Sequence, residues 1–185
     1  KTGDEVSDLF RTFQSTVVRV QKPINRLKVL AWNIWHGGRR TGEVVGVQRT
    51  VELIRSAKID IVCMQETYGS GAIIADSLGF YFYLISSNLS IMSRYPIVEV
   101  YDIYKPFNSG SAMIRLSEEQ DIKVFCIWLH YLPNYTKHVR EKSHTANQLI
   151  QEEGKTRHAE VRQILKEAKP FIDEAEEVPV LMCGD

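Results

Sequence analysis

The chain has 185 residues, 44% of them hydrophobic and 25% charged, which suffices for one globular domain with a sizeable core. Its 23 basic and 23 acidic residues balance to a formal net charge of zero, which argues against a general basic footprint for duplex nucleic acid. No apolar run reaches the roughly 18 residues of a membrane-spanning helix, so we expect a soluble protein, either cytoplasmic or secreted or periplasmic.

The first part of the chain divides into a polar lead-in and a first strand. Residues 1–26 are the lead-in, in which Val17–Val20 is predicted as a short edge strand. A domain is predicted over residues 27–185, and it begins with the strand Leu27–Ile34, which carries Asn33 near its end. We assign the lead-in no function.

A glycine-rich basic loop, His36–Gly42, follows the first strand. Such loops can present backbone N–H groups to a phosphate, but this one matches neither common nucleotide-binding pattern. We therefore expect a flexible connector, with His36 as a candidate substrate contact because it lies so close to Asn33. The next segment, Val44–Lys58, has apolar residues at steps of three and four and is predicted as an amphipathic helix that packs on a sheet.

The stretch Ile59–Glu66 is apolar and rich in β-branched residues, apart from Asp60, until it stops on Gln65 and Glu66. This pattern predicts a strand buried on both faces. With the preceding strand and helix it makes a strand–helix–strand unit, whose crossover is right-handed if the strands are parallel. Glu66 then lies at the carboxyl end of a strand, where open α/β sheets bind their ligands.

The middle of the chain is predicted as one short helix and five strands. These are the helix Ala72–Leu78 and the strands Phe80–Ile85, Leu89–Ser93, Ile97–Tyr101, Ser111–Leu116 and Ile122–Leu129, the last two joined by a polar turn at Ser117–Asp121. Arg94, in the Arg-Tyr-Pro break between two of these strands, is a candidate phosphate ligand, and a structural ion pair explains it equally well.

The polar segment Tyr131–Lys155 is predicted as a long loop. Loops of this length in a compact domain are usually functional or disordered. Because the segment follows His130, we expect it to form a wall of a substrate cleft, with Tyr131 as a contact; a mobile surface excursion is the alternative.

The end of the chain is predicted as a helix and a final strand. Arg157–Ile172 carries one apolar face, and Pro170 is expected to bend or end the helix near Lys169. The strand Val178–Asp185 then closes on a Gly-Asp pair.

The three cysteines, an odd number, cannot all pair within one chain. Cys63, Cys126 and Cys183 all fall inside predicted core strands, where a free thiol behaves as a small hydrophobe. Their spacing does not fit a zinc site, so we expect buried free thiols.

Four predicted strands end on a polar side chain, and these side chains are Asn33, Glu66, His130 and Asp185. Oxygens of Asn, Glu and Asp are the ligands that Mg²⁺ prefers, and a histidine beside them can donate to a phosphate oxygen. Each residue alone also has an ordinary structural explanation, such as a turn former or a satisfied core histidine. Their recurrence at strand ends favours a common site, although spacing does not show that the four ends meet.

Five segments, taken in order, resemble the endonuclease/exonuclease/phosphatase superfamily, which includes deoxyribonuclease-type nucleases, sphingomyelinases and inositol polyphosphate phosphatases. They are Trp32-Asn33-Ile34, Asp60–Glu66, Ile91–Ile97, Trp128-Leu129-His130 and Val180–Asp185. The resemblance implies an α/β (α+β) fold, a four-layer α/β/β/α sandwich of the deoxyribonuclease-like type. The family pattern continues past Gly184-Asp185 with Phe-Asn and a later Asp-His pair, so we expect this chain to hold the N-terminal part of the domain.

The same resemblance implies roles for individual residues. Glu66, with Asn33 close by, would bind Mg²⁺ (or Mn²⁺); Asp185 would orient or deprotonate the attacking water; and His130 would contact the phosphate. Asn33, His130 and Asp185 are then the candidate catalytic residues. His36, Arg94 and Tyr131 are the candidate substrate contacts.

These expectations lead to a divalent-metal-dependent hydrolase of phosphate esters, a phosphodiesterase that acts as a monomer. A nuclease acting on DNA or RNA and a sphingomyelinase-like lipid phosphodiesterase stay open as alternatives. The neutral charge disfavours DNA, and aromatic loop residues suit a lipid headgroup or a small organic phosphate. A non-catalytic binding domain that keeps the fold is the alternative from another class.

Overall fold

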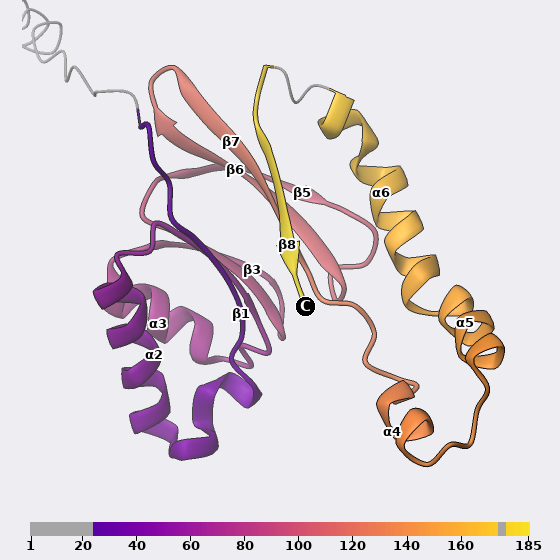
Figure 1. Ribbon diagram of the computed structural model, residues 1–185. Coiled ribbons are helices and arrows are strands. Elements are labelled where there is room, and N and C mark those ends of the chain that lie inside the picture. The colour runs from indigo at the N-terminus through magenta and orange to yellow at the C-terminus, as the bar shows by residue number, and fades with distance from the viewer. Residues whose placement is uncertain (1–23, 174–176) are drawn as a thin grey trace, which may run out of the picture.

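The computed structural model describes residues 24–173 and 177–185, and shows two sheets packed face to face with helices on both outer sides (Figure 1). The four layers are helices α2 and α3, the first sheet, the second sheet, and helix α6. The expected α/β/β/α sandwich is therefore confirmed. The predicted edge strand Val17–Val20 lies outside the described residues.

The first sheet has the strand order β1-β2-β4-β3. Its strands are β1 (Val29–Asn33), β2 (Ile61–Gln65), β3 (Tyr81–Ser86) and β4 (Leu89–Ser93). β1 and β2 are parallel, and Asn33 lies opposite Gln65. All five residues of β2 are buried, as expected for a strand covered on both faces. Asn33 and Glu66 consequently leave the sheet at the same edge.

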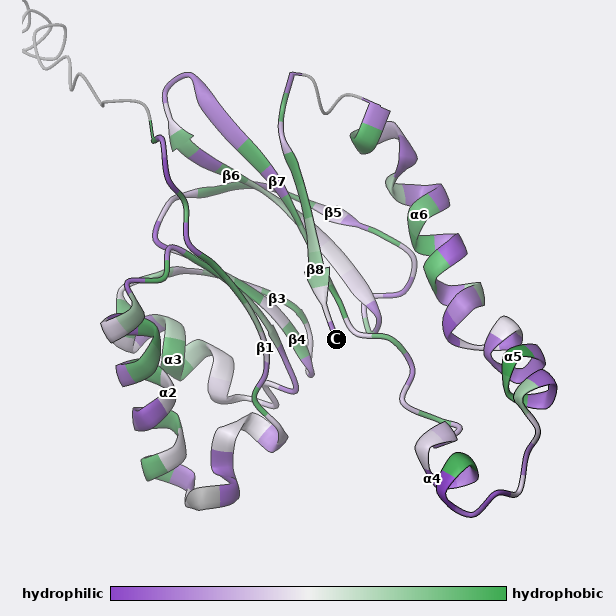
Figure 2. Ribbon diagram, in the orientation of Figure 1, coloured by the Kyte–Doolittle hydropathy of each residue, from purple (hydrophilic) through white to green (hydrophobic). Residues whose placement is uncertain are grey.

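Helices α2 (Glu43–Ala57) and α3 (Ser70–Leu78) cover the outer face of this sheet. The apolar stripe of α2 buries Val47, Val51 and Ile54 against sheet residues such as Val62 and Met92. Figure 2 shows that hydrophobic and hydrophilic residues alternate along these helices, which is the pattern of a helix with one face on a core.

The second sheet has the order β5-β6-β7-β8. Its strands are β5 (Ile97–Asp102), β6 (Ser109–Ser117), β7 (Gln120–Ile127) and β8 (Val180–Gly184). β6 and β7 form the predicted hairpin, whereas β7 and β8 are parallel, with Ile127 opposite Gly184. The parallel pairing brings the ends of β7 and β8, and so His130 and Asp185, to one edge.

The two sheets meet in an apolar core that contains the cysteines. Cys63 and Cys126 are buried and Cys183 is partly buried, and all three are free, so the expected burial is confirmed fully only for the first two. Hydrogen bonding to Cys126, together with burial, holds the pKa of the Cys63 thiol well above its ordinary value. Hydrogen bonding to Cys63, followed by burial, raises the pKa of Cys183. These thiols therefore stay protonated and act as small core side chains.

Helix α6 (Arg157–Asp173) packs on the outer face of the second sheet through Ile164 and Ala168. Pro170 was expected to bend or end the helix near Lys169; the ending is wrong, because the helix continues to Asp173. The Phe171 ring packs against Tyr101 and Phe125, with centroids 4.9 and 5.8 Å away. This packing holds the last turn in place although Pro170 donates no backbone hydrogen bond.

The segment predicted as one long loop after Tyr131 contains two helices, α4 (Tyr135–Arg140) and α5 (Ala146–Lys155). The side chain of Asn134 caps α4 by accepting from Lys137 N. Thr145 and Gln148 form a reciprocal capping box at the start of α5. The loop prediction is therefore wrong for most of this segment.

Candidate active site

Three of the four predicted strand-end residues meet in one hydrogen-bonded group. The Asn33 amide nitrogen, Nδ2, donates to Glu66 Oε1 at 2.9 Å and to Asp185 Oδ2 at 2.7 Å. Asn33 and Glu66 come from the first sheet and Asp185 from the second, so this amide joins the two sheets at one edge. Residues 33 and 185 lie far apart in the sequence, and the strand pairing described above brings them together.

The backbone around Glu66 is shaped to hold its carboxylate. Glu66 has a φ of 57°, an unfavourable conformation for a residue with a side chain. Its Oε2 accepts from His36 N at 3.1 Å, and its backbone carbonyl accepts from Gly37 N at 2.7 Å. Both donors belong to the loop after β1, which thereby fixes the carboxylate toward Asn33.

The glycine-rich loop is a short 3₁₀ helix, η1 (His36–Thr41), and not the flexible connector expected from its composition. Gly37 and Gly38 adopt φ values of 69° and 72°, which glycine reaches without strain. A Cβ on Gly37 would lie 2.7 Å from Ser70 Oγ, so the close approach to α3 also requires glycine. The loop's role is to deliver the His36 and Gly37 amides to Glu66.

Asp185 is held through its backbone by the end of β7. Its amide donates to Ile127 O at 3.0 Å, and its carbonyl accepts from Leu129 N at 2.9 Å. These two bonds continue the parallel β7–β8 ladder by one residue. The carboxylate therefore projects from a fixed strand end.

The His130 side chain lies at the same edge but interacts with different partners. Its backbone N–H donates to Glu160 Oε2 at 2.8 Å, and its Nδ1 lies 3.9 Å from Glu160 Oε1. Arg157 donates to the His130 carbonyl at 3.2 Å. Within the described part of the chain, no hydrogen bond joins the His130 ring to Asn33, Glu66 or Asp185. The structure thus places His130 beside the group of three and orients it from α6.

Aromatic rings lie in the segments that follow the strand ends of both sheets. The His36 ring stacks on Tyr68 and lies near Trp35, with centroids 6.2 and 5.9 Å away. On the other side, Tyr131 stacks on Trp128 and on His130, with centroids 5.9 and 5.8 Å away. Trp35 and Tyr131 are 51% and 60% exposed, so these rings are accessible to a substrate. His36 and Tyr131, the two candidate substrate contacts in these segments, are both exposed.

Arg94 lies at the opposite end of the first sheet from Glu66. Its Nε pairs with Asp60 Oδ1 at 3.1 Å, and it donates to Ile59 O at 3.1 Å. Because β4 runs antiparallel to β2, the residue after β4 lies beside the start of β2, about 16 Å of strand from Glu66. The structure does not bring Arg94 to the other candidate residues. Arg94 instead forms an ion pair with Asp60, which is the structural explanation considered for it from the sequence.

The donors at this edge match the chemistry of a magnesium site in type. Among the described residues, no group of three or more His, Cys, Asp or Glu side chains is arranged to hold a metal ion. Mg²⁺, however, commonly binds through one or two carboxylates and completes its shell with water and substrate phosphate. Glu66 and Asp185, both bonded to one amide nitrogen, fit that requirement. The Asn33 Oδ1 accepts from Trp35 N at 2.9 Å, so it would have to turn to bind a cation.

Tyr68 gives a direct test of how close the Glu66 charge is. Burial raises the pKa of the Tyr68 phenol from 10.0, and the Glu66 carboxylate and Tyr131 raise it further. Because the unfolded chain releases this proton at lower pH, Tyr68 stabilises the fold below pH 10 and loses that contribution as the pH rises through the raised pKa. We expect Glu66→Gln to lower the Tyr68 pKa, measured by NMR titration of ring-labelled tyrosine.

Tyr83 is the matched control for this titration. Burial and Asp102 raise its pKa, and Glu66 does not contribute. The Tyr83 pKa is expected to be the same in both proteins. An unchanged Tyr68 titration in Glu66→Gln would show that the carboxylate does not face this ring.

Sequence reasoning missed Glu160, the residue that orients His130. Helical spacing puts Glu160 on the polar face of α6, and nothing in that spacing indicates that this face meets the end of β7. Its Oε1 also accepts from Asn108 Nδ2 at 3.3 Å, which links α6 to the residue before β6. Helical periodicity shows on which side of a helix a residue lies. It does not show which strand that side of the helix contacts.

Comparisons with known structures agree with this architecture. TDP2 from Caenorhabditis elegans is 15% identical, with a TM-score of 0.60, over 97% of this chain and 54% of that one. A functionally unknown conserved protein from Enterococcus faecalis V583 is 11% identical, with a TM-score of 0.57, over 86% of this chain and 65% of that one. Humanized D. rerio TDP2 is 16% identical, with a TM-score of 0.54, over 86% of this chain and 61% of that one. At these identities the likeness shows the fold alone.

The chain spans between 54% and 65% of the length of these three structures. A comparison with proteins of curated function found no match. In the described ranges 24–173 and 177–185, no helix is both long and apolar enough to cross a bilayer. The model of the Endonuclease/Exonuclease/phosphatase family matches residues 30–185, and the chain therefore belongs to that family.

Proposed function

We propose that this chain carries part of the catalytic centre of a divalent-metal-dependent phosphodiesterase. The family supports a hydrolase of the phosphodiesterase or nuclease type. The observation that carries the finer proposal is the Asn33 amide nitrogen, bonded to both Glu66 and Asp185. It holds two carboxylates from different sheets close together, where their mutual repulsion favours a shared cation.

In this proposal each residue has one task. Glu66, fixed by the His36 amide, binds the cation. Asn33 holds the Glu66 and Asp185 carboxylates next to each other by donating to both. A bound Mg²⁺ or Mn²⁺ would polarise the phosphate and neutralise charge that develops on it. Asp185 accepts a proton from the water whose oxygen attacks phosphorus, while the bond from phosphorus to the leaving alcohol breaks.

His130 is proposed to donate a hydrogen bond to a phosphate oxygen. Glu160 accepts from the His130 backbone N–H at 2.8 Å and lies 3.9 Å from its Nδ1, so α6 fixes the backbone that carries this ring. The exposed rings of Trp35 and Tyr131 would contact groups on either side of the phosphate. Flat apolar surfaces of this kind suit a substrate with rings or an organic headgroup.

The test is hydrolysis of a chromogenic phosphodiester by the full natural chain with Mg²⁺ or Mn²⁺. We expect the activity to disappear with chelator and to return when the metal is restored. Asp185→Asn is expected to lower the rate by about 10²-fold or more, because a proton acceptor is removed. Asp173→Asn, an exposed change at the end of α6, is the matched control and should leave the rate unchanged.

Two outcomes would contradict the proposal. Full activity in chelator would remove the metal from the mechanism, and a wild-type rate in Asp185→Asn would remove the proton acceptor. Tight ligand binding without turnover, across phosphodiesters of nucleotide, lipid and small organic type, would favour the non-catalytic binding domain. The same series of substrates separates a nuclease from a sphingomyelinase-like enzyme.

A further inference from the structure

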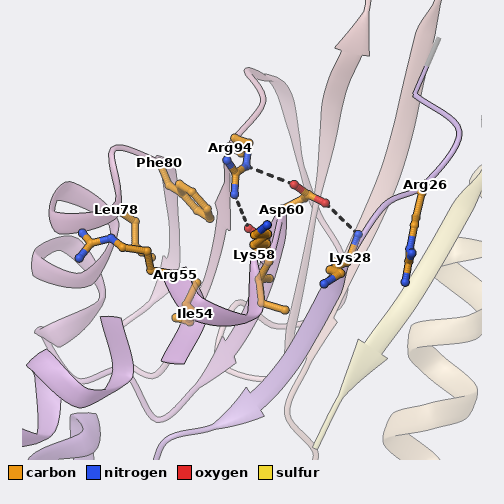
Figure 3. Close-up of a pocket in the computed structure, with 10 residues that line it drawn as sticks. Arg26, Lys28, Ile54, Arg55, Lys58, Asp60, Leu78, Phe80 and Arg94 are labelled. Carbon is orange, nitrogen blue, oxygen red and sulfur yellow. Dashed lines mark hydrogen bonds and ion pairs between the residues drawn. The ribbon is translucent and has the colours of Figure 1, made fainter. Parts of the chain in front are cut away.

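A pocket lies at the opposite end of the first sheet from Glu66. This basal pocket has a volume of about 750 Å³. It lies where α2 ends and β2 begins, and Figure 3 shows side chains from the ends of α2 and α3 and from the segments that flank β1, β2, β3 and β4 around it. The residues that line it are Arg26, Lys28, Ile54, Arg55, Lys58, Ile59, Asp60, Leu78, Phe80 and Arg94.

The basal pocket concentrates positive charge in a chain whose formal net charge is zero. Five of its lining residues are Arg or Lys and one, Asp60, is acidic. The Asp60 carboxylate is already used, because Oδ1 pairs with Arg94 Nε at 3.1 Å and Oδ2 accepts from Lys28 N at 3.0 Å. Little negative charge is left in the pocket to balance the other cations.

Part of this positive charge has a structural explanation. Lys28 Nζ donates to Ala57 O at 2.9 Å, and Arg55 donates to Ser77 O at 2.8 Å. These carbonyls belong to the last turns of α2 and α3, where a cation is favourable. Capping of helix ends therefore accounts for Lys28 and Arg55.

Lys58 and Arg26 are not explained in this way. Within the described ranges, neither side chain makes a hydrogen bond or ion pair with another residue. Lys58 follows α2 with a φ of 55°, a conformation more typical of glycine or asparagine. Its charge on the pocket wall is thus not a requirement of the helix end.

The remaining wall of the basal pocket is apolar. It consists of Ile54, Ile59, Leu78 and the ring of Phe80. The Arg94 guanidinium lies 5.6 Å from the centroid of that ring. Figure 3 shows Phe80 and Leu78 on one side of the pocket and Lys28 and Arg26 on the other. A ligand that fits both sides has an anionic group joined to a flat, apolar ring.

We propose that the basal pocket binds a nucleotide, with its phosphates at Lys58 and Arg26 and its base against the Phe80 wall. Lysine binds phosphate as a point charge and arginine through paired N–H donors, and aromatic or apolar side chains cover a base. The volume lies in the range of small-molecule sites. The five residues of β2 separate this pocket from the candidate active site, so it is a separate site that does not depend on the proposed hydrolysis.

The experiment is calorimetric titration of the full natural chain with ADP, pyrophosphate and adenosine, with chelator present to suppress metal-mediated binding. We expect saturable binding of ADP, weaker binding of pyrophosphate and none of adenosine. Lys58→Asn keeps the backbone conformation while removing the charge, and Arg26→Gln removes the second unpaired charge. Each is expected to weaken ADP binding roughly tenfold.

Lys142→Asn is the matched control, because Lys142 is exposed, has a φ of 51° and lies between α4 and α5. ADP affinity should be unchanged in this variant, and phosphodiester hydrolysis should be unchanged in all three variants. The proposal is overturned if the wild-type chain does not bind ADP or binds pyrophosphate equally well. It is also overturned if Lys142→Asn weakens binding as much as Lys58→Asn, or if Lys58→Asn and Arg26→Gln leave binding unaltered.

Discussion

Glu66→Gln is expected to reduce phosphodiester hydrolysis by about 10²–10³-fold while leaving the fold intact. Glutamine has nearly the same shape and can still accept from the His36 amide, which lies 3.1 Å from the present carboxylate. It lacks the negative charge that would hold the cation. The loss should therefore appear in kcat at saturating substrate, measured over a range of Mg²⁺ or Mn²⁺ concentrations.

The control for this variant is Glu119→Gln, an exposed change in the turn between β6 and β7. It removes the same charge from the same sheet pair without touching the edge that carries Asn33. We expect wild-type rates from Glu119→Gln. If Glu66→Gln also kept the wild-type rate, the cation would not be bound by this carboxylate.

Gly184→Ala is expected to destabilise the chain by about 3 kcal/mol or more. A Cβ at this position would lie 2.0 Å from the Ile127 carbonyl oxygen and 2.7 Å from its carbon. These are backbone atoms of the neighbouring parallel strand, so no side chain can turn away to make room. Strands β7 and β8 would have to separate, which moves Asp185 as well. Urea unfolding measures the loss as a lower midpoint, and the hydrolysis rate should fall with it.

Gly154→Ala in α5 is the matched control, because a Cβ there meets nothing within 4 Å. Alanine is favoured over glycine inside a helix, so the free energy of unfolding should stay the same or rise by up to about 1 kcal/mol. The urea midpoint should not fall. Equal stability of the Gly184→Ala and Gly154→Ala proteins would contradict the close pairing of β7 with β8.

The strand ends could be predicted from the sequence because each one combines an apolar run with a polar stop. Their meeting point could not, since it depends on the pairing of β1 with β2 and of β7 with β8. The single amide that joins Glu66 to Asp185 is a consequence of that pairing. The family resemblance supplied the order of the motifs and hence the expectation that they converge.

Arg94 shows why position along the chain is a weak guide to position in a sheet. It follows β4, and a strand antiparallel to β2 ends where β2 begins, so Arg94 reaches Asp60 and not Glu66. Sequence alone does not give the direction of β4. From the sequence, a structural ion pair explained Arg94 as well as a phosphate contact did, and the structure shows the ion pair with Asp60.

The helices after Tyr131 were missed although one signal was present. Polar composition suggested a loop, but Thr145 and Gln148 have the spacing of a capping box. Ala146, Leu149 and Ile150 stand at steps of three and four, but they are surrounded by polar residues, and α5 buries none of its residues. Pro170 indicated an end or a bend near Lys169, but the helix continues past it to Asp173. The packing of Phe171 on the second sheet compensates for the backbone hydrogen bond that proline cannot donate.

The central claim is that Asn33, Glu66 and Asp185 form one cation-binding centre between the two sheets. The most direct measurement is anomalous diffraction from crystals of the full natural chain grown with Mn²⁺. The account predicts a Mn²⁺ peak bonded to the Glu66 carboxylate, with Asn33 and Asp185 at its border. A Mn²⁺-saturated crystal without a peak at Glu66, or with Asp185 turned away from that edge, would contradict it.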